Sequence, residues 1–334
     1  MEIKFKEKKV LNGPKVVVIG GGTGLSILLR GLKKYTPNIT AIVTVADDGG
    51  GSGVLREDLG MLPPGDIRAC LLALANTEPT MEKLLQYRFD NGVLKGQSFG
   101  NLFIAAMNGI YGSFEMAIKE TSNVLAITGR VYPMTLEKVK LFAELENGEI
   151  VEGESNIPII AMEKSSNIKR MFIDPKISNP LKESIEAIQQ ADLIVLGPGS
   201  LYTSVIPNLL INDIVNKIYE AKAPKVYISN VMTQPGETDG YDLMDHVQAI
   251  LDHSRQDLLD YVIANIEEIP KETLSKYITD GSMPVILKEE HIELLKDKSI
   301  KIITDNLIDI KKNYIRHDNI KLSQLLIDIS KKEK

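Results

Sequence analysis

The stretch KVVVIGGGTGLS, residues 15–26, predicts a strand, a tight turn and the start of a helix. Its four β-branched residues, Val16–Ile19, run without polar alternation, as in a strand that is buried on both faces. Four glycines then permit a tight turn, and apolar residues recur at helical spacing from Leu25 onward. This order directs backbone N–H groups and the positive end of a helix to one point, so the sequence predicts an anion site there.

Four residues of this turn are candidate phosphate ligands: Gly21, Gly22, Thr23 and Gly24. The strict dinucleotide fingerprint needs a third small residue, but this chain has Leu25 or Ile27 at that place. No Gly-Lys-Ser/Thr follows, which excludes the P-loop of nucleoside-triphosphate enzymes. The alternative is a structural turn whose glycines serve close packing, and the density of glycines favours a bound phosphate over it.

Composition places the chain among ordinary soluble proteins, because 334 residues with 43% hydrophobic and 25% charged residues can bury a full core. A net charge of −6 argues against non-specific nucleic-acid binding, which depends on concentrated positive charge. The single cysteine, Cys70, excludes an internal disulfide and is consistent with a reducing cytoplasm. No apolar run reaches transmembrane length, and we interpret the lysine-rich residues 1–10 as a solvated leader.

A second glycine-rich turn follows the predicted strand Ile39–Val45. It begins with Asp47 and Asp48 and continues as GGGSG, where Gly50 and Ser52 are candidate ligands in a second anion-binding nest. An acidic residue at this point often contacts a ribose hydroxyl, and paired carboxylates can instead hold Mg²⁺ together with substrate phosphates. An aspartate-rich structural turn is the remaining alternative.

Several polar side chains after this turn are further candidates. Arg56 lies on a short predicted helix, and Asp66 is the expected N-cap of a helix over Ile67–Ala75. Arg68 falls in the first turn of that helix, where a cation opposes the helix dipole, so we interpret it as a phosphate ligand. Asn101 lies beside an apolar run, where it either binds a ligand or hydrogen-bonds nearby backbone groups.

A strand expected over Asp192–Leu196 ends in another turn of small and hydroxyl residues. Its candidate ligands are Gly197, Gly199, Ser200 and Tyr202. The next strand, Lys225–Ser229, leaves through a polar loop with the candidates Asn230 and Thr233. In a doubly wound parallel sheet these strand ends share one crevice, where ligands bind. Several anion nests, an acidic pair and few basic residues suit a diphosphate that is held by backbone amides.

Alternation of strands and helices predicts one α/β domain over residues 1–334, with a mainly parallel, doubly wound sheet and a core at about 15–329. Further predicted elements are mostly helix over 79–122, strands at 124–128, 261–264 and 300–304, and a closing helix at 322–329. The first strand is expected to be central. This architecture is typical of Rossmann-like proteins.

A β-rich insertion is predicted at about 129–175, on an edge of the sheet. Within it, Asn147-Gly148 predicts a hairpin turn, and Ile157–Ile160 predicts an extended segment. The four histidines are expected outside the glycine and polar loops, with His246 and His253 on the solvent face of one helix. This placement gives little support to a histidine base or a histidine metal site.

Five motifs together carry a resemblance to a known family: GGGTGLS, VADDGGGSG, LPPGDIR, SFGNLF and LGPGSLYTS. With them the chain resembles the bacterial gluconeogenesis-factor proteins of the YvcK type, which are relatives of 2-phospho-L-lactate transferase (CofD). The resemblance implies a CofD-like Rossmann fold and a cytoplasmic protein needed for growth on gluconeogenic carbon sources. It also implies a part in cell shape and wall synthesis, with binding of UDP-sugars such as UDP-N-acetylglucosamine.

The resemblance assigns the family's phosphate loop to Gly20–Gly24, its acidic pair to Asp47 and Asp48, and its later phosphate turn to Gly197–Ser204. The transferase branch moves a phospholactyl group from a guanosine diphosphate donor to a deazaflavin with Mg²⁺. That branch has a tryptophan after the acidic pair and then a Pro-Asp-x-Asp-Thr segment, whereas this chain has no tryptophan and reads PGDIR at residues 64–68. This difference favours the bacterial branch.

The first hypothesis is therefore a regulatory protein that binds a nucleotide sugar, with Mg²⁺ as a possible cofactor. The second is a transferase that cleaves a nucleotide diphosphate bond. A nicotinamide-dependent oxidoreductase is disfavoured by the missing third small residue. The expected partners are a UDP-sugar, no nucleic acid, possible further copies of the chain and possible cell-wall synthesis proteins.

Overall fold

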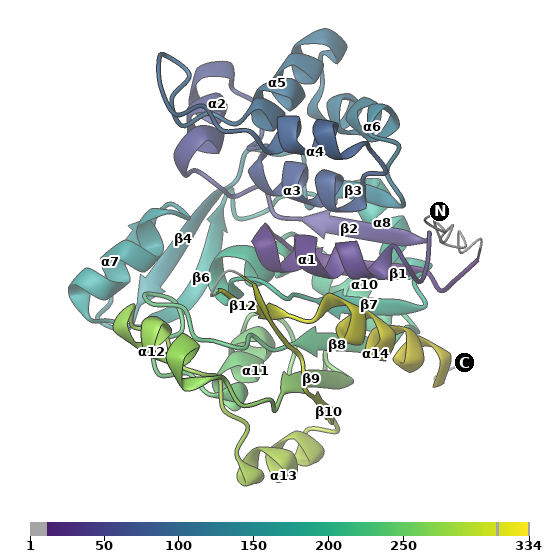
Figure 1. The fold of residues 1–334 in the computed structure, drawn as a ribbon. Helices are drawn as coiled ribbons and strands as arrows, with labels where there is room; N and C mark the ends of the chain where they lie inside the picture. The colour runs from purple at the N-terminus through teal and green to yellow at the C-terminus, as the bar shows by residue number, and fades with distance from the viewer. Residues whose placement is uncertain (1–11, 312–313, 333–334) are drawn as a thin grey trace.

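Seven strands pair into one parallel sheet in the computed structural model, which describes residues 12–311 and 314–332. The strand order is β10-β9-β8-β7-β1-β2-β3, and each neighbouring pair is parallel (Figure 1). The strands are β1 (Val16–Gly20), β2 (Ile39–Val43), β3 (Arg130–Pro133), β7 (Leu193–Leu196), β8 (Lys225–Ile228), β9 (Tyr261–Asn265) and β10 (Lys301–Asp305). The predicted fold class and the interior position of the first strand are confirmed.

The direction of the strand order reverses at β1. From β1 the chain winds outward through β2 to β3, and it then returns to the other side of β1 and winds through β7 to β10. β1 and β7 pair in register from Val16↔Leu193 to Ile19↔Leu196, so their following loops leave side by side at one edge of the sheet. Such a reversal is where open α/β sheets bind their ligands.

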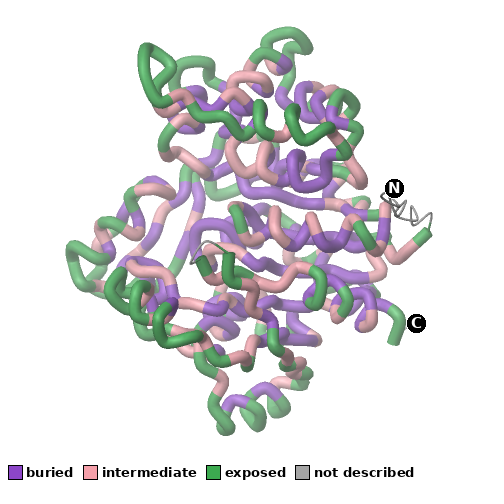
Figure 2. Tube along the Cα trace, viewed as in Figure 1, coloured by how far each residue is buried: buried purple, intermediate pink, exposed green. Residues whose placement is uncertain are grey.

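Helices cover both faces of this sheet (Figure 1). The helices on the front face in that view are α1 (Gly22–Leu32), α3 (Gly65–Leu74) and α14 (Asn319–Lys332). The opposite face is covered by α8 (Lys182–Gln189), α9 (Ile206–Leu209) and α10 (Ile214–Glu220). Because both faces are covered, the central strands are buried throughout, and the helix surfaces that face outward are exposed (Figure 2).

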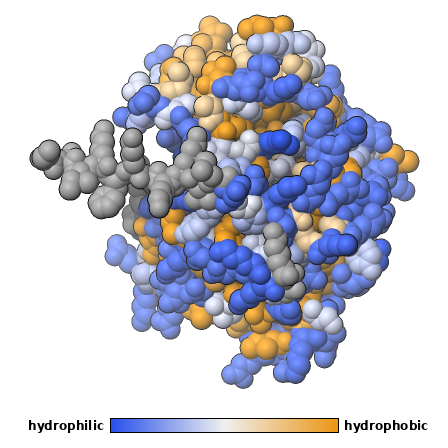
Figure 3. All heavy atoms as spheres, turned by 90° about the vertical axis from the view of Figure 1, so that its right-hand side faces the viewer, coloured by the Kyte–Doolittle hydropathy of each residue, from blue (hydrophilic) through white to orange (hydrophobic). Residues whose placement is uncertain are grey.

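The remaining helices and one hairpin lie around this framework. They are α2 (Gly50–Leu59), α4 (Pro79–Gln86), α5 (Phe99–Tyr111), α6 (Phe114–Val124), α7 (Asn156–Lys164), the π-helical turn η1 (Leu201–Val205), α11 (Leu243–Asp252), α12 (Lys271–Thr279), α13 (Glu289–Asp297), β11 (Ile308–Lys311) and β12 (Tyr314–His317). Seen from the right-hand side of Figure 1, the surface is mostly hydrophilic, and apolar atoms gather at the top (Figure 3). Helices α4–α6 lie there and carry exposed apolar side chains such as Met81, Leu84 and Ile110.

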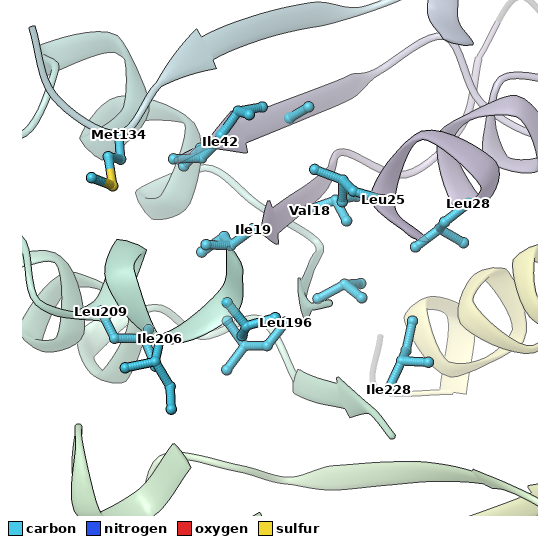
Figure 4. Packing of buried hydrophobic residues seen from close by; sticks show 14 of the residues in the cluster. Val18, Ile19, Leu25, Leu28, Ile42, Met134, Leu196, Ile206, Leu209 and Ile228 are labelled. Carbon is cyan, nitrogen blue, oxygen red and sulfur yellow. The ribbon is translucent and has the colours of Figure 1, made fainter. Parts of the chain in front are cut away.

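Alternation along β1 sends successive side chains into the two halves of the core. Val18 lies beside Leu25 of α1, while Ile19 lies near Leu196 on the side of α9, which contributes Ile206 (Figure 4). All of these side chains are fully buried. The unbroken apolar run of the sequence therefore corresponds to a strand that packs on both faces, as predicted.

The β-rich insertion is a separate antiparallel sheet with the order β5-β4-β6. Its strands are β4 (Lys140–Leu145), β5 (Ile150–Glu152) and β6 (Ile168–Asp174). Asn147-Gly148 forms the predicted hairpin turn between β4 and β5, with Gly148 at φ +87°. The first residues assigned to the insertion, 130–133, instead form β3 of the main sheet.

Two predicted strands are wrong. Ile157–Ile160 is helical within α7, where Ile157 and Ala161 form one buried face and Ile159 is exposed. A short apolar run has no period that separates strand from helix, and tertiary packing decided it. The strand predicted at Val124–Thr128 is the end of α6 and a turn, with Val124 59% exposed. β3 begins later, at Arg130, where its register pairs it with Thr40 of β2.

The predicted leader at residues 1–10 lies outside the described residues. Across residues 12–311 and 314–332, every helix is too short or too polar to span a lipid bilayer. The prediction of no membrane span agrees with this finding.

Close contact between α1 and α14 gives a test of the packing. A β-carbon on Gly31 would lie 2.2 Å from the carbonyl oxygen of Asn319, so we expect Gly31→Ala to lower the free energy of unfolding by about 1–3 kcal/mol. Gly109 in α5 has no atom within 4 Å of that position, so Gly109→Ala should be neutral or stabilising by up to about 1 kcal/mol. Urea denaturation of both variants measures the difference, and equal losses would contradict this packing.

Candidate functional site

The N-termini of four helices meet at the carboxyl edge of the sheet. Helices α1, α2, α3 and α5 begin after the N-cap residues Gly21, Gly49, Pro64 and Ser98. A β-carbon on Gly21 would touch the carboxylate of Asp66, which lies in the first turn of α3. The Ser52 hydroxyl of α2 accepts a hydrogen bond from the Asn101 amide of α5 at 3.4 Å. The dipoles of these four helices therefore create a positive electrostatic potential at the carboxyl edge of the sheet.

The glycine turn after β1 is compressed between two neighbouring loops. A β-carbon on Gly21 would lie 2.4 Å from Oδ2 of Asp66, and one on Gly24 would lie 2.7 Å from the carbonyl oxygen of Pro198. Gly22 has φ +66°, a conformation that favours glycine. The sequence predicted glycines for a tight turn, and the structure adds that Gly21 and Gly24 let the turn pack against α3 and the loop after β7.

Asp66 corrects an expectation, because it does not cap its own helix. Pro64 is the N-cap of α3, and no side chain caps that end. The Asp66 carboxyl group instead accepts a hydrogen bond from the backbone amide of Gly22, at the start of α1. Burial raises the pKa of Asp66 to about 6, and nearby Asp47 adds to the rise. One of the amides predicted to bind phosphate thus has a protein carboxyl group as its partner.

The acidic pair divides into two roles. Asp48 accepts hydrogen bonds from the amides of Glu154 (3.1 Å) and Ser155 (3.0 Å) and from the Ser155 hydroxyl (2.8 Å). Asp48 therefore joins the loop after β2 to the start of α7 in the insertion. Asp47 accepts from the amide of Gly49 at 2.9 Å through Oδ1, and its Oδ2 makes no hydrogen bond to a described residue. Asp47 is therefore the member of the pair with one oxygen that accepts from no described residue.

This division limits how a Mg²⁺ ion would fit. Both oxygens of Asp48 accept backbone amides, and within the described part of the chain no three His, Cys, Asp or Glu side chains are grouped to hold a metal. Mg²⁺ commonly takes one or two carboxylates and completes its shell with phosphate and water oxygens. Asp47 Oδ2 fits that arrangement, whereas a chelating Asp47–Asp48 pair does not.

The glycine run after Asp48 is not the separate nest that we expected. Gly50, at φ +48°, begins α2, and the run forms the first turn of that helix. Ser52 is buried there. The first backbone amides of this helix have no partner within the helix, as at any helix N-terminus, and no side chain caps them.

Both predicted arginines bind the protein itself. Arg56 donates to the carbonyl oxygens of Ala46 and Asp47, each at 3.4 Å, and to that of Val139. Arg68 donates to the Ser98 hydroxyl, and its Nε is buried without a partner. Burial and the nearby Arg88 lower the pKa of Arg68. Arg56 therefore holds the loop after β2 in place, and Arg68 links α3 to the start of α5.

The turn after β7 also directs its polar groups inward. Ser200 donates to the side-chain carbonyl oxygen of Gln234 at 2.7 Å. Tyr202 is buried, and its hydroxyl lies 2.7 Å from that of Tyr241. The amide of Tyr202 donates to Glu237 at 3.2 Å. Tyr202 thus stabilises the turn through contacts in the protein interior.

Glu237 and Glu154 are two site residues that sequence reasoning did not single out. Glu237 is 2% exposed, and its carboxyl group accepts hydrogen bonds from the Tyr202 amide and the Thr203 hydroxyl at the start of η1. Burial raises the pKa of Glu237 to about 7. Burial raises the pKa of Glu154 to about 8, and Asp47 is the largest contributor among four neighbouring carboxylates. The polar loop after β8 offered a signal for Glu237, whereas Glu154 reaches the site only through the folded insertion.

A cleft of about 320 Å³ opens beside the glycine turn, on its β7 and β8 side. Five predicted residues line it: Thr23, Gly24, Gly199, Ser200 and Asn230. Five more polar or aromatic residues line it, Gln234, Tyr277, Tyr314, Arg316 and His317, and the rest of the described lining is apolar. None of the described lining residues is acidic. An anion bound in this cleft would therefore contact the Arg316 guanidinium and none of the described carboxylates.

Thr233 and the histidines differ from expectation. The amide and hydroxyl of Thr233 pair with the backbone of Met283 at 2.7 and 2.8 Å, outside the cleft. His317 lines the cleft, and its Nε2 donates to the carbonyl oxygen of Ser229 at 3.1 Å. Burial lowers the pKa of His317 to about 4. His246 and His253 were predicted to lie on the solvent face of one helix, but that face of α11 packs inside the molecule. His246 is fully buried, and half-buried His253 accepts a hydrogen bond from the backbone amide of Met171.

Comparisons with known proteins agree with these motifs. The family model of 2-phospho-L-lactate transferase CofD matches residues 16–308. A protein from Thermoanaerobacterium thermosulfurigenes is 62% identical over 325 residues, covering 97% of this chain and 99% of its own. The gluconeogenesis factor of Bacillus subtilis is 49% identical over 319 residues, covering 95% and 98%. The crystal structure of a UPF0052 family protein from Bacillus halodurans has a TM-score of 0.89 at 48% identity, covering 93% and 98%.

The two aspartates should respond differently to the same substitution. Asp48→Asn removes a charged acceptor of two amides, so we expect a loss of about 1.5 kcal/mol or more in the free energy of unfolding. Asp47→Asn should leave that free energy within about 0.5 kcal/mol, since Oδ2 has no protein donor. Urea titration of both variants tests this assignment, and equal effects would argue against it.

The raised pKa of Glu237 leads us to expect that the stability of the protein depends on pH. Its pKa rises from 4.5 to about 7 on folding, so the unfolded chain releases its proton at lower pH than the folded chain. We therefore expect the contribution of Glu237 to be full below pH 4.5 and to be lost as pH rises through 7, by up to about 1.4 kcal/mol per pH unit. The melting temperature of Glu237→Gln should fall less between pH 5 and 8 than that of the parent. Parallel profiles would contradict the assignment.

Proposed function

Because this chain belongs to the CofD family, we propose that it binds a nucleotide-linked sugar in the cleft beside the glycine turn, with UDP-N-acetylglucosamine as the expected ligand. The observation that carries the proposal is the composition of that cleft. It joins the turns after β1 and β7 at the reversal of the strand order and adds one guanidinium. Asp47 and Asp66 lie on the α3 side of the glycine turn, and Glu237 lies behind the cleft wall, where it accepts a hydrogen bond from the lining residue Gln234. The presence of a guanidinium and the absence of a carboxylate among the described lining residues favour phosphate binding in the cleft.

The phosphates, the base and the ribose of the ligand each have a matching group in the cleft. The Arg316 guanidinium can bind phosphate oxygens in a bidentate manner, and the Thr23 hydroxyl and the backbone of Gly199 add donors. Tyr277 and Tyr314 offer aromatic surface to a base. Asn230 carries both a donor and an acceptor for a base or ribose. Our choice of uridine as the base rests on the resemblance to the bacterial branch of the family and not on the lining of the cleft.

The names of the relatives extend this proposal to physiology. Proteins named gluconeogenesis factor, such as those of Bacillus subtilis and Listeria monocytogenes, match nearly the whole chain. We propose the same role here, in the cytoplasm: support of growth on gluconeogenic carbon sources and of cell shape through wall synthesis. Bound nucleotide sugar would then report the supply of wall precursors, with wall-synthesis proteins or further copies of the chain as partners.

A transferase is the second candidate, favoured by the free Asp47 Oδ2 and by the transferase family model. The cleft itself argues against rapid chemistry, because the pKa of its one histidine is lowered to about 4 and its ring already donates to Ser229. We therefore expect UDP-N-acetylglucosamine to survive prolonged incubation with the protein and Mg²⁺. Steady release of UDP or UMP would favour the transferase.

Arg316 offers the direct test of binding. At a hundred times its dissociation constant, a ligand adds about 2.7 kcal/mol to the free energy of unfolding, which corresponds to a few degrees in melting temperature. We expect this shift with UDP-N-acetylglucosamine, little shift with NAD⁺, and its loss in Arg316→Ala. Arg170→Ala is the control, since this exposed arginine pairs with Glu144 in the insertion. An unchanged shift in Arg316→Ala would refute the proposed cleft.

A further inference from the structure

Two buried acceptors on the other side of the glycine turn have no partner. The side-chain carbonyl oxygens of Asn101 and Gln97 are inaccessible to solvent and accept no hydrogen bond from a described residue. Asn101 is 2% exposed and Gln97 is 9% exposed. An unpaired acceptor at this depth costs free energy unless it accepts a hydrogen bond, so two of them beside one helix end point to a group that donates.

Both side chains lie against the first turn of α2. Gln97 Oε1 lies 2.8 Å from the position of a β-carbon on Gly51. The Asn101 amide nitrogen donates to the Ser52 hydroxyl at 3.4 Å. That hydroxyl and Asp47 Oδ2 lie 2.5 and 2.9 Å from the position of a β-carbon on Gly65. Side chains from three elements therefore gather around the start of α2, where Asp47 is half-buried and the helix end is open to solvent.

The chemistry of this group distinguishes between possible ligands. The unpaired atoms are acceptors, so the ligand must offer hydrogen-bond donors. A metal cation fits the neutral oxygens of Asn101 and Gln97 poorly, because the positive ends of α2 and α5 lie beside them, and only Asp47 Oδ2 suits a Mg²⁺ ion. Neutral hydroxyl and amide N–H groups fit well, since they donate to Asn101 and Asp47 and accept from the amides of the α2 turn.

We propose that this acceptor group is the sugar subsite, which takes the hydroxyl and N–H groups of the hexose while the cleft holds the nucleoside diphosphate. The inference rests on the proposed function. The glycine turn connects the two parts, because Gly21 lies against Asp66 of α3 and Gly24 lies against the loop that borders the cleft. A diphosphate on this turn would direct one end of the ligand to each side.

Calorimetric titration with two probes, UDP and UDP-N-acetylglucosamine, tests the subsite. Asn101→Leu keeps the size of the side chain and removes both polar atoms, so we expect its affinity for UDP-N-acetylglucosamine to fall at least tenfold, about 1.4 kcal/mol. Its affinity for UDP should stay within twofold. Gln97→Met removes the other acceptor at similar size and should show the same selectivity, which keeps the test valid if Asn101→Leu does not fold.

Arg316→Ala separates the two proposals, because it should weaken both probes equally. Equal affinities of the parent and of the folded Asn101 and Gln97 variants for the sugar nucleotide would overturn the subsite and leave the nucleotide cleft standing, with an ordered water as the partner of the acceptors. Equal losses for both probes in those variants would also overturn it. Absence of binding of either probe to the parent would refute the proposed function and the subsite together.

Discussion

Unpaired backbone N–H groups at helix N-termini are the constraint on which this edge of the molecule depends. Helices start here because parallel strands return through crossovers, and each start brings donors without partners. The chain supplies its own carboxyl groups to three of them: Asp66 at α1, Asp48 at α7 and Glu237 at η1. The motif that predicts an anion site in sequence thus has a second use, which is to bind distant parts of the protein together.

Collecting carboxylates at one edge has an electrostatic consequence. Burial raises the pKa of Asp66, Glu237 and Glu154 to about 6, 7 and 8, and neighbouring carboxylates add to the rise at Asp66 and Glu154. An anionic ligand is unfavourable beside ionised carboxylates and favourable in the cleft, which has Arg316 and no described acid. The glycine turn separates the cleft from Asp47 and Asp66, whereas Glu237 lies behind the cleft wall and accepts from Gln234. The difference in charge between the two sides would favour one orientation of a ligand with a charged and a neutral end.

The insertion takes part in the site because of one contact. Asp48 accepts the amides of Glu154 and Ser155, and this pairing brings the Glu154 carboxyl group among those of the main sheet. On the other side of the insertion, the amide of Met171 donates to His253 of α11. The small sheet is therefore anchored at two points to elements that support the ligand loops, and its position and the geometry of the site are linked.

The sequence alone determined the parallel sheet, the interior first strand and the loops that carry the site, because unbroken β-branched runs and glycine turns are local signals. It also singled out Thr23, Gly199, Ser200 and Asn230, which line one cleft in the structure. Tertiary structure decided the roles of Asp48, Asp66 and Arg56, since a side chain's partner in another element leaves no trace in its own neighbourhood. It likewise brought Arg316 and Glu154 to the site from a hairpin and an insertion, because only folding makes residues so far apart in the chain adjacent in space.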